Sequence, residues 1–126
     1  MNWYEILIKP PFTPPSWVFA PAWIFLYITI GVSLVIFLKT GFNRQKLLPL
    51  TFFLIQLALN FLWSPIFFGA KNVGFALVII LLMLLFLILT IVTFYKYSKL
   101  SAYLLIPYLF WVVFATYLNA GIYFLN

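Results

Sequence analysis

Three groups of aromatic and polar residues recur at helical spacing within otherwise apolar stretches of the chain. The groups are Phe19, Trp23 and Tyr27; Gln56, Asn60 and Trp63; and Trp111, Ala115 and Asn119, with Tyr108 one turn before the last group. Residues three and four positions apart lie on the same face of a helix, so each group forms one stripe. The stripes offer amide hydrogen bonds and ring stacking, and they carry no group that would transfer a proton at neutral pH.

The amide side chains indicate that these stripes face the interior of a helix bundle. An amide side chain in an apolar medium needs a hydrogen-bond partner and usually faces the interior of a helix bundle. Three helices would then surround a pocket with tryptophan and tyrosine walls, which suits a flat, largely apolar ligand. The alternative is that Gln56, Asn60 and Asn119 only link helices and that the aromatic side chains pack or contact lipid. Spacing alone leaves both interpretations open.

The composition places this chain in a membrane. Of its 126 residues, 67% are apolar and only 6% are charged, whereas a soluble domain is about 45–50% apolar and about 25% charged. We therefore predict an integral membrane protein in which residues 1–126 form a single domain, with the lipid bilayer as its first partner.

The same composition excludes several kinds of chemistry. The chain has no cysteine, no histidine and one acidic residue, Glu5, so disulfides, Cys/His metal sites and paired-carboxylate hydrolysis are ruled out. We expect no metal site and no required cofactor, and the chain offers no acid–base pair for catalysis. The net charge of +6 comes from basic residues scattered among the connections, which is not the pattern of a nucleic-acid surface.

Four runs are long enough to cross a bilayer as helices, which takes about 20 apolar residues. They comprise residues 17–38, 47–68, 73–94 and 101–125, preceded by a loop rich in proline and tryptophan at residues 1–16. The short connections force neighbouring spans to run antiparallel. The predicted fold is an all-α integral membrane protein, an antiparallel transmembrane helix bundle with four visible spans.

Basic residues predict the orientation of this bundle. The first and third connections hold five of the seven: Lys39, Arg44, Lys46, Lys96 and Lys99. Because Lys and Arg accumulate on the cytoplasmic side of membrane proteins, we place these two connections in the cytoplasm and the N-terminal loop outside. The expected location is a prokaryotic cell membrane.

Two classes of transport protein fit the spans poorly. A proton-coupled exporter normally carries its proton on an acidic residue within the membrane, and the four spans contain no Asp, Glu or His. An ion channel needs a polar filter or a ring of charge, which one copy of the chain does not supply.

Three segments together resemble the TspO/MBR family of tryptophan-rich sensory proteins, relatives of the mitochondrial translocator protein (peripheral-type benzodiazepine receptor). The segments are "WYEILIKPPFTPPSWVFAPAWIFLY", "QLALNFLWSPIFF" and "SAYLLIPYLFWVVFATYLNAGIY", which span nearly the whole chain from Trp3 onward. The resemblance implies a helical bundle, commonly a homodimer, that binds porphyrins and other tetrapyrroles in a sensory or regulatory role linked to tetrapyrrole metabolism or stress. In some bacterial members it also implies light- and oxygen-dependent porphyrin breakdown, and a transporter is a further alternative.

The resemblance also assigns roles to individual residues. Tyr4 matches a tyrosine of the loop that caps the family's pocket, and Trp23 and Trp111 match two pocket tryptophans associated with porphyrin breakdown. Pocket-lining positions correspond to Tyr27, Asn60, Trp63 and Ala115. These positions largely coincide with the stripes, and the resemblance therefore favours the pocket over helix linkage alone.

Two features depart from the family pattern. The family has five spans, with one ahead of the Pro/Trp-rich loop, whereas this sequence shows four. The family's basic sterol motif near the C-terminus is missing as well, since no Lys or Arg follows Lys99. That second departure argues against sterol binding.

Overall fold

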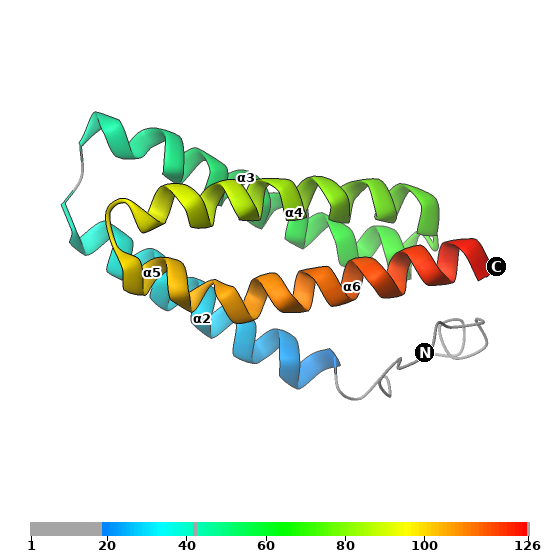
Figure 1. Cartoon of the computed structure of the whole chain (residues 1–126). Helices are drawn as coiled ribbons and strands as arrows, with labels where there is room; N and C mark the ends of the chain where they lie inside the picture. Colours follow the sequence, from blue (N-terminus) through cyan, green and yellow to red (C-terminus); the bar gives the residue numbers. More distant parts are fainter. Residues whose placement is uncertain (1–18, 42, 126) are drawn as a thin grey trace.

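The computed structural model describes residues 19–41 and 43–125, with only the backbone described at positions 19, 64 and 68. The helices are α2 (Phe19–Lys39), α3 (Leu47–Ser64), α4 (Val73–Tyr95), α5 (Lys99–Leu104) and α6 (Ile106–Leu125), with a 3-10 turn at Arg44–Lys46 and a π-helical turn at Pro65–Gly69. Within these residues, four helical stretches are long and apolar enough to cross a membrane. They run alternately in opposite directions (Figure 1), which confirms the predicted helical membrane bundle.

Prolines lie in the first turns of two helices and at the irregular turn that follows α3. Pro21 and Pro49 lie in the first turns of α2 and α3, where a missing N–H removes no helical hydrogen bond. Pro65 follows α3 directly, and the chain then widens into the π-helical turn, closed by a bond from the Ala70 N–H to the Pro65 carbonyl at 2.9 Å. The N-terminal loop at residues 1–16, including Tyr4, lies outside the described residues.

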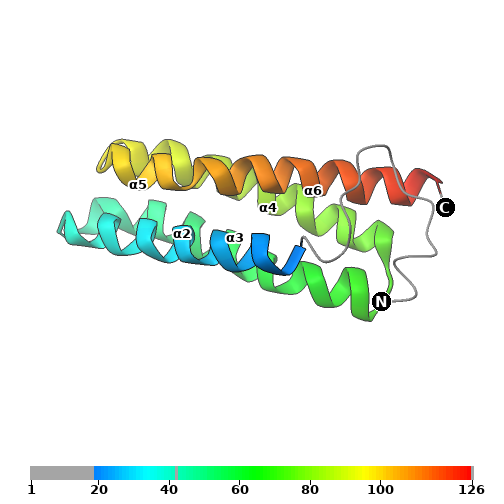
Figure 2. The ribbon, with the colours of Figure 1, turned by 90° about the horizontal axis from the view of Figure 1, so that it is seen from below.

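The last predicted span contains a break that the apolar pattern did not reveal. Residues 101–125 were expected to form one helix, but Leu105 separates α5 from α6. Pro107 explains the break, because its ring conflicts with the carbonyl of Tyr103 four residues earlier and it has no N–H to donate. The two helices still follow each other as one rod (Figure 2).

Side-chain caps start the helices that follow the short turns. The Asn72 Oδ1 accepts a hydrogen bond from the Phe75 N–H at the start of α4, at 3.1 Å. The Ser98 Oγ accepts one from the Ser101 N–H at the start of α5, at 3.2 Å. Each cap satisfies a donor that the first helical turn leaves unpaired.

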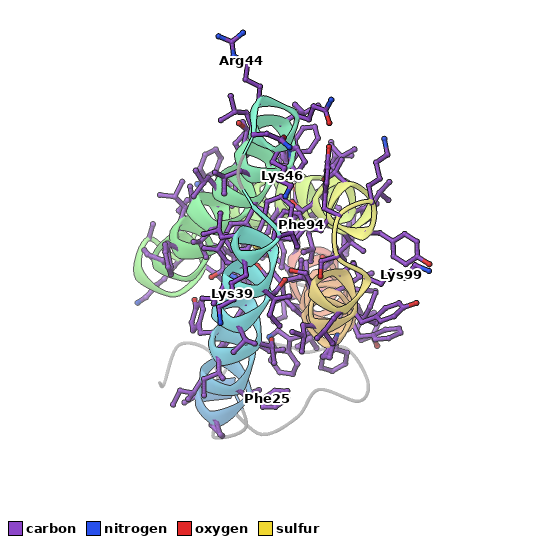
Figure 3. All side chains as sticks on the ribbon, turned by 90° about the vertical axis from the view of Figure 1, so that its left-hand side faces the viewer. Phe25, Lys39, Arg44, Lys46, Phe94 and Lys99 are labelled. Carbon is purple, nitrogen blue, oxygen red and sulfur yellow. The ribbon has the colours of Figure 1, made fainter. Side chains whose placement is uncertain are left out.

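The first connection is closed by a buried lysine. The Lys46 ammonium donates hydrogen bonds to the Thr40 Oγ1 and to the carbonyl of Gly41, and it lies 5.2 Å from the centre of the Tyr97 ring. Gly41 has a φ of 95°, a left-handed conformation that suits glycine at the end of a helix. Figure 3, which looks onto this end of the bundle, shows Lys46 directed inward toward Phe94 and Arg44 directed outward. Lys46 is therefore partly a structural residue, held by helix-end carbonyl and cation–π contacts.

A close contact between small residues joins α2 to α5. The Ser33 Oγ donates to the Ser101 carbonyl at 2.7 Å, and the Ser101 Oγ in turn donates to the Ser33 carbonyl. Both side chains are fully buried. Small polar residues let helices in a membrane approach closely and bond across the contact.

This contact predicts a difference between two substitutions of Ser33. Ser33→Ala removes only a hydrogen bond and should destabilise the protein by about 0.6 kcal/mol, the average for such bonds in membranes. Ser33→Leu must also push α2 away from α5 and should cost about 1–3 kcal/mol. Thermal unfolding of the detergent-solubilised protein measures both values, and equal shifts for the two variants would contradict close packing at this point.

Candidate functional site

The aromatic stripes of three helices meet around Trp23. The centre of its ring lies 6.0 Å from that of Trp111 on α6 and 6.4 Å from that of Trp63 on α3. Tyr27, one turn further along α2, lies 5.8 Å away in a stacked arrangement. We call Trp23, Tyr27, Trp63 and Trp111 the aromatic cluster.

A chain of hydrogen bonds runs from this cluster into the core. The Tyr27 hydroxyl donates to the Asn60 Oδ1 at 2.6 Å, and the Asn60 Nδ2 donates to the Tyr108 hydroxyl at 2.6 Å. The Tyr108 hydroxyl lies 2.9 Å from the Gln56 Oε1, to which it donates, and 3.6 Å from the Met83 sulfur. Hydrogen bonds between polar side chains therefore link α2, α3 and α6 in addition to their apolar packing. We call Tyr27, Asn60, Tyr108 and Gln56 the polar chain.

One donor at the deep end of the polar chain remains open. The Gln56 side chain is fully buried, and its Nε2 has no hydrogen-bond partner among the described residues. A buried donor without a partner costs free energy that an acceptor would recover. The polar chain therefore ends, among the described residues, at a donor that the surrounding protein encloses.

A second amide fixes the orientation of Trp63. The Trp63 Nε1–H donates to the Asn119 Oδ1 at 2.9 Å, and the Asn119 Nδ2 donates to the Val73 carbonyl at 3.0 Å. Asn119 is almost fully buried. It joins α6 to the end of α3 and the start of α4, and so holds the indole that contacts Trp23.

The aromatic cluster is closely packed. The Trp23 and Trp111 rings meet edge to face, with an interplanar angle of 87°. A flat ligand stacked between two parallel rings needs about 3.5 Å on each side, or about 7 Å between the rings. Trp111 must therefore turn or move before a ligand can stack on both indoles.

Comparison with known proteins decides what kind of protein this is. The sequence model of the TspO/MBR family matches residues 1–125. The chain belongs to the TspO/MBR family. Among its relatives, the tryptophan-rich protein TspO of Archaeoglobus fulgidus is 50% identical over 125 residues, which cover 99% of this chain and 80% of that protein. The translocator protein of Homo sapiens is 44% identical over 121 residues, covering 94% and 72% respectively. The tryptophan-rich sensory protein of Cereibacter sphaeroides is 37% identical over 118 residues, covering 94% and 73%.

The structure brings most of the predicted site residues of this TspO/MBR protein together. Ring contacts and hydrogen bonds join eight of them in the aromatic cluster, the polar chain and the Asn119 bridge: Trp23, Tyr27, Gln56, Asn60, Trp63, Tyr108, Trp111 and Asn119. Ala115 is buried in the core on α6, one turn from both Trp111 and Asn119. Phe19 begins α2, but its side chain lies outside the described residues, as does the whole of Tyr4. The ligand-binding roles of all these residues stay predictions.

Helix α4 of the TspO/MBR bundle contributes contacts that the sequence did not single out. Its sequence has no polar or tryptophan stripe, yet the Met83 sulfur and the Val73 carbonyl both contact the site. Phe67, from the π-helical turn, stacks on Trp63 with ring centres 5.1 Å apart. A methionine in a uniformly apolar helix and a backbone carbonyl carry no signal in the sequence.

The site offers only a few kinds of chemical group. In the part of the chain that the structure describes, no cluster of His, Cys, Asp or Glu could hold a metal ion. The site offers indole and phenol faces, hydroxyl and amide groups, and no formal charge. It can stack on a flat molecule and exchange a few hydrogen bonds with it.

Proposed function

We propose that this TspO/MBR protein is a membrane receptor or sensor for porphyrin or a related tetrapyrrole, and that it regulates tetrapyrrole metabolism or a stress response. The observation that carries the proposal is Trp23, whose ring lies against both Trp63 and Trp111 above a buried polar chain. Aromatic faces stack on a flat macrocycle. The remaining predicted residues, including Tyr4, Phe19, Ala115 and Asn119, would surround or cap the same ligand.

Titration with protoporphyrin IX tests this function directly. The protein reconstituted in phosphatidylcholine nanodiscs should bind the porphyrin saturably, with a shift in porphyrin absorbance and quenching of tryptophan fluorescence. Binding that rises linearly with porphyrin concentration, as in empty nanodiscs, would overturn the proposal.

An enzymatic alternative draws on the same residues. In this alternative, oxygen oxidises a bound, photo-excited porphyrin, and Trp23 or Trp111 relays an electron during the reaction. Under illumination in air, this alternative requires a new bilin-like absorbance that does not form in the dark. Bleaching at the rate of porphyrin in empty nanodiscs would exclude it. Transport is a separate alternative and would require porphyrin flux in proteoliposomes.

The proposal includes an orientation and an assembly. We infer that residues 1–126 form a single domain embedded in a prokaryotic cell membrane. Its cytoplasmic end is the one that carries Lys39, Arg44, Lys46 and Lys99 (Figure 3). A homodimer in the membrane rests on the family resemblance alone.

The absence of native cysteine makes the orientation testable. Asn43 and Ala70 are exposed in the first and second connections, at opposite ends of the bundle. In intact cells, a membrane-impermeant maleimide should label an Ala70→Cys variant and should label an Asn43→Cys variant only after permeabilisation. The reverse pattern would contradict the orientation.

A further inference from the structure

An open apolar groove lies between the first half of α2 and α6. It has a volume of about 290 Å³, and its lining includes Ala22 and Phe25 of α2 and Pro107, Phe110, Trp111 and Phe114 of α6. Phe25 and Phe110 are 57% and 69% exposed. Because both helices cross the membrane here, the groove opens toward lipid rather than toward water.

The position of this groove follows from how the helices pack. The Ser33–Ser101 contact clamps α2 closely against α5. Past the break at Leu105, α6 packs on α2 less extensively than the much shorter α5 does. Small Ala22 and bulky phenylalanines of both helices line the space that stays open between them.

Trp111 belongs both to the groove and to the aromatic cluster. Its indole is one wall of the groove, and the same ring meets Trp23 edge to face with centres 6.0 Å apart. It also lies beside Phe114, whose ring centre is 5.9 Å away and which lines the groove as well. One side chain thus contacts both the lipid-facing groove and Trp23.

We propose that the groove is a lateral entrance through which a flat, apolar ligand dissolved in the bilayer reaches Trp23, with Trp111 as its gate. This inference rests on the proposed function and adds the route and the moving residue. A largely apolar macrocycle partitions into lipid, where it is already desolvated, and the groove walls demand no hydrogen bond from it. Turning the Trp111 indole from perpendicular toward parallel with the Trp23 ring opens the path and supplies the second stacking face.

Filling the groove tests the entrance. We expect Ala22→Phe to slow protoporphyrin IX association from preloaded vesicles by about fivefold or more, because a constriction on the route raises the barrier. Dissociation should slow by the same factor and leave Kd within about twofold of wild type, since a barrier acts equally in both directions. Val35→Phe, at an exposed position of the same helix, is the matched control and should leave both rates unchanged.

The outcomes separate the entrance from the function it serves. Saturable binding by wild type with an unchanged association rate in Ala22→Phe would overturn the lateral entrance and leave the receptor proposal standing. A weaker Kd with an unchanged association rate would also overturn it, because the groove would then be part of the binding site. If wild type shows no saturable binding, the receptor proposal itself fails, and with it the ligand's route.

A second measurement needs no ligand. In vesicles of phosphatidylcholine with brominated acyl chains, bromine quenches indoles that lipid can reach. We expect Trp111→Phe to remove a larger share of the quenchable fluorescence than Trp63→Phe, since Trp63 is 7% exposed within the core. Ala22→Phe should shield Trp111 from the bromine. Equal quenching in wild type and Ala22→Phe would show that lipid does not enter the groove.

Discussion

Replacing Asn60 by leucine is expected to lower the free energy of unfolding by about 1–3 kcal/mol, the range for leaving buried hydrogen-bonding groups without partners. Asn60 both accepts from Tyr27 and donates to Tyr108, each at 2.6 Å. Its loss therefore interrupts the polar chain between α2 and α6. The lower part of the range applies if the bonds behave like the average interhelical bond in a membrane, about 0.6 kcal/mol each.

A double-mutant cycle isolates this contribution. Asn60→Leu and Tyr108→Phe are combined, and unfolding is followed in detergent by heat or by a denaturant. Because the two groups bond directly, the effects should be non-additive, with a coupling of about 0.5 kcal/mol or more. Thr51→Val is the control, since the exposed Thr51 hydroxyl bonds only within its own helix, to the Leu47 carbonyl. Strict additivity at Asn60 and Tyr108 would contradict the polar chain.

The second large effect is expected on porphyrin affinity. Replacing both Trp23 and Trp111 by leucine removes the two indole faces proposed to hold the macrocycle. Aromatic pairs contribute about 0.5–1.5 kcal/mol each beyond the apolar area they bury. Two such losses correspond to a Kd for protoporphyrin IX raised by about 5- to 150-fold, since each 1.4 kcal/mol is a factor of ten.

The control for this variant must remove two aromatic side chains elsewhere. Phe124→Leu with Tyr103→Leu is suitable, because these side chains are 77% and 56% exposed and lie near opposite ends of the bundle. The control should keep the wild-type Kd. Measuring unfolding of each variant beside its affinity separates a lost stacking face from a disturbed fold. Equal affinity in the Trp23/Trp111 variant and the control would remove the basis for the binding site.

The two predictions also address the choice that residue spacing left open, between amides that link helices and amides that serve a ligand. The contacts of Asn60 and Asn119 show that both amides do link helices. Helix linkage and ligand binding are compatible here, because the same bonds hold the tyrosine and tryptophan rings in place around Trp23. The stability cycle measures the first role, and the porphyrin titration measures the second.

The sequence alone determined the membrane location, the helical spans and the faces of the site. The chain has too few charged residues to cover a water-exposed surface. An unpaired amide in a membrane is costly, and this cost predicts which face of its helix points into the bundle. Spacing of three or four residues is set by local helix geometry, and this is why Trp23 with Tyr27 and Gln56 with Asn60 could be grouped before any fold was known.

Only the tertiary structure decided which partners these faces meet. Tyr27 bonds to a residue 33 positions away and Ser33 to one 68 positions away, and such pairings depend on how helices cross rather than on any local pattern. Lys46 shows the same limit, since the sequence placed it in a connection and gave no sign that it would be buried near the rings of Phe37 and Tyr97. The groove beside Trp111 exists because Ser33 and Ser101 draw α2 toward α5 while α6 begins anew beyond Leu105. No single stretch of sequence predicts this groove, because it depends on small residues where α2 meets α5 and on bulky residues where α2 meets α6.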